Sequence, residues 1–280
     1  MPRTTRRGVR SGLPFPALVL AVVAIAFFAL PLAGLLWRAP WSHAWGYLTA
    51  HDSLTALRLS LWCSLCATAL SIVFGVPLAW LLARVEFAGR GLVRALCLLS
   101  MVLPPVVGGV ALFFALGRRG LVGQYLDRWF DVRLPFTTAG VVVAQTFVAM
   151  PFLVITVEAA LRQHDQRIEA AARTLGASRW YTFRRVTLPA VRPAIVAGAV
   201  LAWARALGEF GATITFAGNF PGTTQTLPLA VYLALDTNPE QAIVLALVLI
   251  VVSFAVLVGL RDRWWGNVRS EAVDTTRWWS

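Results

Sequence analysis

The stretch RIEAAARTLGASRWYTFRRVTLP, residues 167–189, differs in composition from the segments on both sides of it. It carries five arginines and one glutamate, whereas its neighbours are strongly apolar. Asp165 can cap a first short helix, and Gly176 stands where a glycine commonly ends one. Ser178 can cap a second short helix, which we expect the Leu188–Pro189 pair to end. The pattern predicts a pair of short helices outside the apolar part of the chain.

The apolar segments around this stretch are long enough to cross a membrane. Charged residues make up 14% of the 280 residues and the mean hydropathy is +0.71, whereas a soluble domain contains about 25% charged residues. Lipid offers no partners to backbone polar groups, so apolar runs of about 20 residues are expected to be helices. Runs without Asp, Glu, Lys or Arg cover residues 13–37, 59–83, 95–117, 134–157 and 242–260, and a sixth begins near Pro193 and is interrupted by Arg205 and Glu209. We therefore expect an all-α integral membrane protein with about six transmembrane helices.

The arginines predict which side of the membrane each loop occupies. The net charge of +12 comes wholly from arginine, because the sequence contains no lysine. The arginines gather in the N-terminus (Arg3, Arg6, Arg7, Arg10), after the second run (Arg84, Arg90, Arg94), after the fourth (Arg162, Arg167, Arg173, Arg179, Arg184, Arg185, Arg192) and in the tail (Arg261, Arg263, Arg269, Arg277). With six spans these four regions share one side, which the positive-inside rule makes cytoplasmic. The loop after the third run is an exception, since Arg118, Arg119, Arg128 and Arg133 accompany Asp127 and Asp131.

This orientation divides the chain into a cytoplasmic N-terminus (residues 1–12), one transmembrane domain (13–260) and a cytoplasmic tail (261–280). The loop at 162–192 then places its short helix pair in the cytoplasm, between the fourth and fifth spans. The basic start of the chain resembles a signal peptide, but the apolar run after it is longer than the 7–15 residues of a cleaved signal. We expect that run to be retained as the first span.

The composition also argues against several functions. Without lysine there is no Walker A motif, so the chain is not expected to hydrolyse ATP in the P-loop manner. The arginines lie between apolar runs, so topology explains them better than nucleic acid does. Cys63-x-x-Cys66 has no second ligand pair, and these cysteines and Cys97 lie in or beside apolar runs. We interpret all three as small apolar side chains.

The helix pair resembles the signature loop of importer permeases in the ATP-binding-cassette (ABC) superfamily, E-A-A-x-x-x-G followed by I-x-L-P. Counting back from Gly176 places Ala170 where that family often has its glutamate, with Glu169 one residue earlier. The resemblance implies that this loop couples the chain to an ATPase. It assigns the coupling residues as Glu169, Ala170, Ala171, Ala172, Leu175, Gly176, Val186, Leu188 and Pro189.

Three further stretches resemble the molybdate permease branch of that superfamily and, more loosely, the sulfate permeases. They are ARALGEFGATITFAGNFPGTTQTLPLAVY at 204–232, VLPPVVGGVAL at 102–112 and AQTFVAMPFLV at 144–154. The resemblance implies a homodimer in the bacterial plasma membrane, two cytoplasmic ATPase subunits holding ATP and Mg²⁺, and an external binding protein. No cofactor is expected on this chain. The candidate residues of the translocation path are Pro104, Pro105, Gly108, Arg205, Gly208, Glu209, Phe210 and Gly211.

Several alternatives stay open at this point. Tungstate or sulfate and thiosulfate could replace molybdate as the substrate. A membrane-embedded enzyme would need a catalytic constellation, yet only Arg205 and Glu209 are ionisable inside a span. A passive channel would not need the docking loop. Arg205 and Glu209 are four residues apart and can pair, which favours a structural role, although Arg205 could instead attract the anion.

Overall fold

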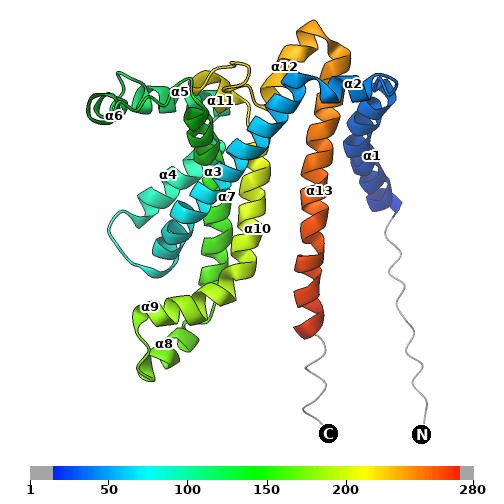
Figure 1. The fold of residues 1–280 in the computed structure, drawn as a ribbon. Coiled ribbons are helices and arrows are strands. Elements are labelled where there is room, and N and C mark those ends of the chain that lie inside the picture. Colours follow the sequence, from blue (N-terminus) through cyan, green and yellow to red (C-terminus); the bar gives the residue numbers. More distant parts are fainter. Residues whose placement is uncertain (1–14, 272–280) are drawn as a thin grey trace, which may run out of the picture.

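The computed structural model describes residues 15–271, and the structure of that part of the chain is helical (Figure 1). Residues 1–14 and 272–280 lie outside the described part, so it does not cover the predicted cytoplasmic N-terminus or the end of the tail. The elements are α1 (Phe15–Arg38), α2 (Ala44–Thr49), α3 (His51–Arg84), α4 (Arg90–Val102), α5 (Pro105–Leu116), α6 (Gly123–Phe130), α7 (Thr138–Gln163), α8 (Gln166–Thr174), α9 (Arg179–Thr182), the π-helix η1 (Phe183–Thr187), α10 (Leu188–Leu207), α11 (Gly211–Phe216), α12 (Leu227–Thr237) and α13 (Pro239–Glu271).

Within residues 15–271, five helices are long and apolar enough to span a membrane. They cover Pro16–Arg38, His51–Arg84, Thr138–Gln163, Arg179–Leu207 and Pro239–Val256. The remaining expected segment, 95–117, is the third in chain order and is divided into α4 and α5 at Leu103 and Pro104. Proline disfavours helical geometry in the residue before it, and Leu103 is extended, with φ −60° and ψ 134°. The predicted membrane architecture is therefore confirmed, with its third segment broken in the middle.

The centre of the molecule is the packing of α3 against α7 and α10. All but one of the buried residues of α3 are small: Ser53, Ala56, Ser60, Cys63, Ser64, Ala67, Ser71, Gly75 and Ala79 share this face with Leu82. Small residues allow membrane helices to approach closely. At Gly75 an added Cβ would lie 3.0 Å from Cδ2 of Leu153 on α7. This stripe lets α3 lie in close contact with α7, and α10 packs against both helices.

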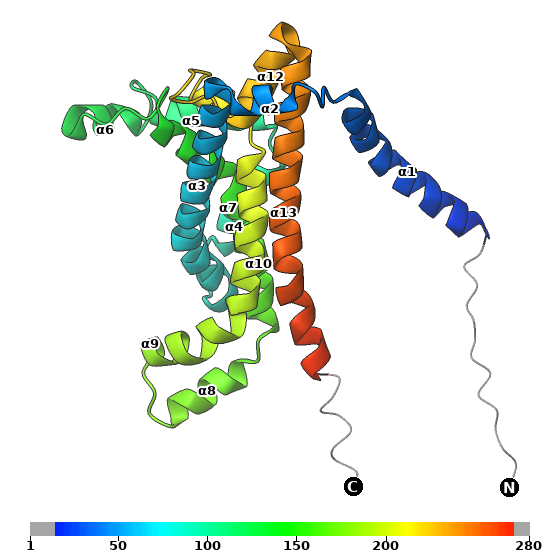
Figure 2. The same cartoon turned by 45° about the vertical axis from the view of Figure 1, so that its right-hand side comes forward.

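Figures 1 and 2 show at which end of the bundle the connecting segments lie. Helices α8 and α9 lie at the lower end of the bundle, the end that the start of α1 and the end of α13 also face. Helices α2 and α12 lie at the opposite end. Helix α1 stands apart from the other helices in both views, and none of its membrane-spanning window is buried within the chain.

The expectation that Leu188 and Pro189 end the second short helix is wrong. Helix α9 continues through η1 into α10, and one helix runs from Arg179 to Leu207. The backbone N–H of Leu188 donates to the carbonyl of Phe183, five residues earlier. Pro189, which has no N–H to donate, follows this π turn directly, in the second residue of α10. The wide π turn lets the helix pass this proline without a break.

Candidate functional site

The helix pair of the loop has the caps that the sequence predicts. The carboxylate of Asp165 accepts from the backbone N–H of Arg167 at 2.9 Å, at the start of α8. The hydroxyl of Ser178 accepts from the N–H of Tyr181 at 3.2 Å, at the start of α9. Gly176 between them has φ +87°, a left-handed conformation that side chains other than glycine disfavour. The turn geometry therefore requires the glycine.

The end of α8 presents a small and apolar surface. Ala170, Ala171 and Gly176 are exposed, Ala172 is half-buried, and Leu175 is 89% exposed. A Cβ added at Gly176 would meet nothing within 4 Å, so the space beside it is open in this chain. Open space beside an exposed leucine and small residues is suited to close approach by another protein.

Glu169 does not face outward with these residues. Its Oε1 accepts from Nη2 of Arg84 at 2.9 Å, and the two side chains are only 15% and 7% exposed. Nη2 of Arg84 also lies 3.4 Å from the carbonyl oxygen of His164. Arg84 is the last residue of α3, so this ion pair ties the first helix of the loop to the inner end of the bundle.

The second half of the loop packs against α3 through aromatic rings. Trp180 stacks on Phe183 with ring centroids 5.8 Å apart, and Phe183 meets Trp80 of α3 edge-on at 6.2 Å. Of the other coupling residues, Val186 and Leu188 are half-buried and Pro189 is exposed. The predicted coupling residues are thus mostly exposed at the end of α8, whereas Val186 in η1 and Leu188 at the start of α10 are half-buried.

A second charge cluster, around the buried Glu158, lies at this end of the molecule and was not predicted from the sequence. Glu158 on α7 accepts from Arg94 of α4 and lies 3.1 Å from Nη2 of Arg162. Its side chain is 9% exposed. Arginines that directly flank the uncharged runs are the signal that could have revealed both Arg84 and Arg94 as anchors.

The structure brings together two of the predicted path segments, where helices are broken. Pro104 and Pro105 begin α5, and the Phe210–Gly211 step begins α11. A Cβ on Gly211 would lie 2.8 Å from Cβ of Pro105, and one on Gly108 would lie 3.1 Å from the ring of Phe147. Discontinuous helices in contact are typical of transport paths.

Arg205 and Glu209 form the predicted ion pair. Nη1 of Arg205 lies 2.6 Å from Oε2 of Glu209, whose side chain is 1% exposed. Helix α10 ends at Leu207, so Glu209 lies just beyond it. Its other oxygen, Oε1, accepts from the backbone N–H of Ala212 at 2.7 Å, in the first turn of α11. One carboxylate therefore neutralises Arg205 and satisfies a free N–H of the next helix. Nearby, Gly208 is exposed and Phe210 packs against Tyr232 at 5.1 Å.

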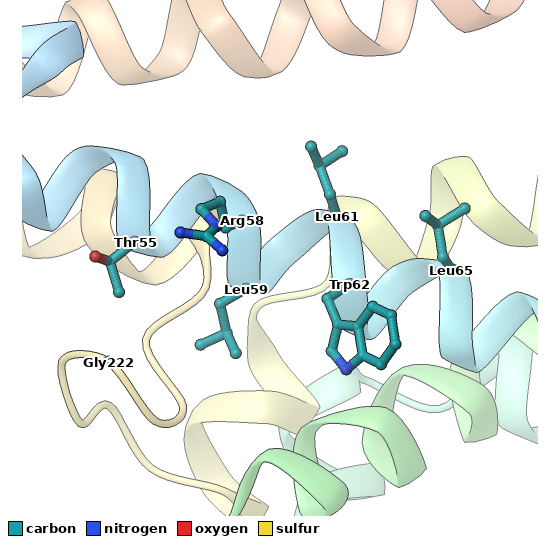
Figure 3. Close-up of a pocket in the computed structure, with 7 residues that line it drawn as sticks. All are labelled: Thr55, Arg58, Leu59, Leu61, Trp62, Leu65 and Gly222. Atoms are coloured by element: carbon teal, nitrogen blue, oxygen red, sulfur yellow. The ribbon is translucent and has the colours of Figure 1, made fainter.

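Figure 3 shows a pocket near the start of α3, which was not predicted from the sequence. Its volume is about 510 Å³, and it is lined by Thr55, Arg58, Leu59, Leu61, Trp62, Leu65 and Gly222. Arg58 precedes the second uncharged run directly and is exposed, as is Trp62 at 65%.

The arginine-rich loop that departs from the orientation rule contains its own ion pairs. Asp127 of α6 accepts from Nε of Arg133 at 2.6 Å and from Nε of Arg118 at 2.9 Å. The hydrogen bonds from Arg133 and Arg118 lower the pKa of the Asp127 carboxyl below its usual value. Two of the four arginines are thus paired locally, which weakens them as topology signals.

Comparisons with known proteins agree with this geometry. Residues 71–264 match the family model described as "Binding-protein-dependent transport system inner membrane component". The chain is 46% identical to the molybdenum transport system permease protein ModB of Mycobacterium tuberculosis, over 87% of this chain and 92% of that protein. It is 42% identical to ModB of Escherichia coli, over 77% and 94%.

A sulfate permease and a solved transporter are also similar. The sulfate transport system permease protein CysT of Escherichia coli is 38% identical, over 74% of this chain and 76% of that protein. Among solved structures, a bacterial ABC transporter for import of the acidic polysaccharide alginate superposes with a TM-score of 0.66 at 21% identity, covering 92% of this chain and 95% of the other. At 21% identity this similarity is evidence for a shared fold and for nothing finer.

Proposed function

The chain belongs to the family of binding-protein-dependent transport system inner membrane components, and from this premise we propose that it is the permease subunit of a molybdate importer. It is a multi-pass protein of the bacterial plasma membrane. The observation that carries the substrate class is the 42–46% identity to ModB permeases over most of the chain. Sulfate is the second candidate, because the sulfate permease CysT is 38% identical.

The proposed driving force is ATP hydrolysis on a separate partner chain. The exposed end of α8, with Leu175 and Gly176, supports this assignment, because it offers a partner a small apolar surface fixed by two helix caps. We propose one ATPase subunit for each of two permease copies. The unburied surface of α1 and the exposed face of α3 around Trp62 and Phe74 support a second copy, since large apolar patches indicate contact surfaces or lipid.

The proposed mechanism is alternating access without covalent chemistry. Movement of α8 and α9 is carried into the membrane by the continuous helix that runs to Leu207. The end of that helix lies beside α11 and α5, where Gly211 and Pro105 are in contact. Motion of α10 can therefore change the contact between the two broken helices, which we assign to the translocation path together with Gly108, Gly208 and Phe210.

Within this path we assign Arg205 and Glu209 a structural role. Both carboxylate oxygens of Glu209 are already in contact with a partner, one with Arg205 and the other with the N-terminus of α11. An incoming dianion would have to displace that carboxylate to reach either group. The pair thus holds the connection between α10 and α11, and we expect the substrate to pass beside it.

Reconstitution tests the proposed function. The chain is inserted in liposomes with a candidate partner ATPase and a candidate binding protein from the same organism, and ATP hydrolysis is measured with molybdate, tungstate or sulfate. Stimulation by molybdate at concentrations where sulfate has no effect is expected. Stimulation by sulfate alone would assign the chain to the sulfate branch, and hydrolysis that none of the oxyanions changes would overturn the assignment.

A further inference from the structure

A groove at the inner end of the bundle has a composition that the transport function does not explain. Its volume is about 630 Å³, and it lies between the end of α3 and the helix pair α8–α9. The residues that matter for its chemistry are Trp80, Arg84, Arg173, Arg179, Trp180 and Phe183. We propose that this inner groove binds an anionic phospholipid.

The position of the groove matches the boundary between lipid chains and headgroups. Pro77 and Trp80, which line it, belong to the uncharged run 59–83, and Arg84 is the first charged residue after that run. Tryptophan is enriched at this depth, because its ring is apolar and its N–H can reach water. One wall of the groove therefore faces hydrocarbon while its floor lies at headgroup level.

The charge of the groove calls for an anion. Three arginines, Arg84, Arg173 and Arg179, face a single carboxylate, that of Glu169. Basic pockets beside membrane helices on the cytoplasmic side are suited to acidic lipid headgroups. A zwitterionic headgroup would bring its own positive charge close to the same arginines, so an anionic lipid is favoured.

Arg84 has hydrogen-bonding capacity that nothing in the described chain uses. Its side chain is only 7% exposed. Nη2 donates to Glu169, while Nε and Nη1 are buried and have no hydrogen-bond partner in the described part of the chain. Leaving such donors without an acceptor is costly. The oxygens of a phosphate diester would satisfy them with charge-assisted bonds.

The apolar part of the groove distinguishes a lipid from a soluble anion. Trp80 and Phe183 pack edge-on, Trp180 stacks on Phe183, and Trp180 remains 68% exposed. A soluble phosphate would leave these rings uncovered, whereas the first methylenes of an acyl chain would cover them. Because the groove touches α3, α8 and α9, the lipid would join the coupling helices to the bundle. This inference is independent of the transported substrate.

Native mass spectrometry of the full chain in detergent tests the proposal. Phosphatidylglycerol and phosphatidylcholine are titrated separately, and phosphatidylglycerol is expected to bind about tenfold more tightly, which corresponds to about 1.4 kcal/mol. The double variant Arg173→Gln/Arg179→Gln should lose that preference. The matched variant Arg184→Gln/Arg185→Gln should retain it, because it removes two exposed arginines from the adjacent turn that do not line the groove. Equal losses in both variants, or equal binding of the two lipids, would refute the site.

Two further measurements keep the outcome unambiguous. Phosphatidylglycerol with brominated acyl chains quenches the fluorescence of nearby tryptophans. The fraction of fluorescence that it quenches should be smaller in Trp80→Phe/Trp180→Phe than in a variant that lacks two tryptophans elsewhere. Equal quenching per remaining tryptophan in the two variants would contradict the location. Glycerol phosphate, which lacks acyl chains, should not displace the lipid at millimolar concentration. Displacement would identify the ligand as a soluble phosphate. Unfolding midpoints in phosphatidylcholine verify that each variant folds, and Arg179→Gln alone replaces the double variant if it does not.

Discussion

Arg84, the last residue of α3, holds Glu169 of α8 at 2.9 Å in a nearly buried ion pair, so the coupling loop is anchored to a membrane helix other than the one it precedes. Along the chain, α9 and η1 lie between α8, which contains Glu169, and α10. The pair provides a second connection between the loop and the bundle. Movement of α8 must therefore either move the end of α3 or break this contact.

Neutralising Glu169 should loosen α8 without unfolding the bundle. Removing one partner of a buried ion pair costs about 3–5 kcal/mol, which exceeds what a short helix with one side-chain cap, that of Asp165, can supply. In Glu169→Gln we expect faster hydrogen exchange at the amides of residues 166–174, with the rates in α7 unchanged. Glu86→Gln is the matched control, because Glu86 is exposed close to the same end of α3. Unaltered exchange in α8 would show that the cap alone holds the helix.

Gly176→Leu should uncouple transport while the protein still inserts and assembles. Its left-handed φ of +87° adds about 1–2 kcal/mol of strain for a side chain, and the added leucine would meet no atom of this chain but would obstruct a partner. Substrate-stimulated ATP hydrolysis in liposomes measures the loss. Gly176→Asn should lose less, because asparagine tolerates this conformation and is smaller. Normal transport by Gly176→Leu, with dimer recovered in detergent, would make the glycine an ordinary turn residue.

The dual contact of Glu209 makes a double-mutant cycle with Arg205 informative. Arg205→Leu leaves a buried carboxylate unpaired. Glu209→Leu leaves Arg205 unpaired and, in addition, removes the acceptor for the N–H of Ala212. Glu209→Leu should therefore reduce the amount of recovered dimer more than Arg205→Leu does. Arg205→Leu/Glu209→Gln should recover most of the loss, because the amide oxygen can still accept from Ala212. If instead Arg205→Leu abolishes uptake with the dimer intact and no change at Glu209 restores it, Arg205 serves the anion directly.

Accessibility of single cysteines should confirm the orientation. With the three native cysteines replaced, Thr174→Cys in α8 and Thr223→Cys in the loop before α12 place one exposed thiol at each end of the bundle. An impermeant thiol reagent applied to intact cells with a permeabilised outer barrier should label only Thr223→Cys. Labelling of Thr174→Cys under these conditions would reverse the topology.

The pairing around Asp127 should depend on pH. The folded-state pKa of Asp127 is lowered, so the stabilisation is present above the usual carboxyl pKa of about 4 and is lost as the pH falls through the lowered value. We expect the ¹⁹F resonance of fluorotryptophan at Trp129, assigned with Trp129→Phe, to shift only in that acidic window. Asp127→Asn should remove the transition, and a transition that persists would assign it to another group.

The sequence predicted the features that depend on local chemistry. Apolar run length identified the membrane segments, and the caps at Asp165 and Ser178 followed from residue type and spacing. The pairing of Arg205 with Glu209 followed from their separation of four residues. These features could be predicted because each depends on residues close together in sequence.

Features that depend on packing between distant segments were not predictable. Nothing near Glu169 in sequence indicates that its partner is Arg84, which is 85 residues away. The continuation past Leu188 and Pro189 was missed because a proline usually ends a helix, and only the π turn at η1 makes room for it. The inner groove likewise exists only where α3 meets the loop.

The π turn at η1 also bears on the rotational orientation of α9 and α8 around the axis of α10. An α-helix turns about 100° per residue, and a hydrogen bond that spans five residues instead of four leaves one residue more in that turn. Deleting one residue from 183–187 would restore the ordinary helix and leave α9 and α8 close to their present azimuth around the axis of α10, because the extra residue lies within the π turn itself. Deleting one residue from α10 beyond this turn would instead rotate α9 and α8 by about 100°. Leu175 would then point away from its present direction, and Glu169 could no longer reach Arg84. A single-residue deletion should therefore be tolerated better within 183–187 than within α10.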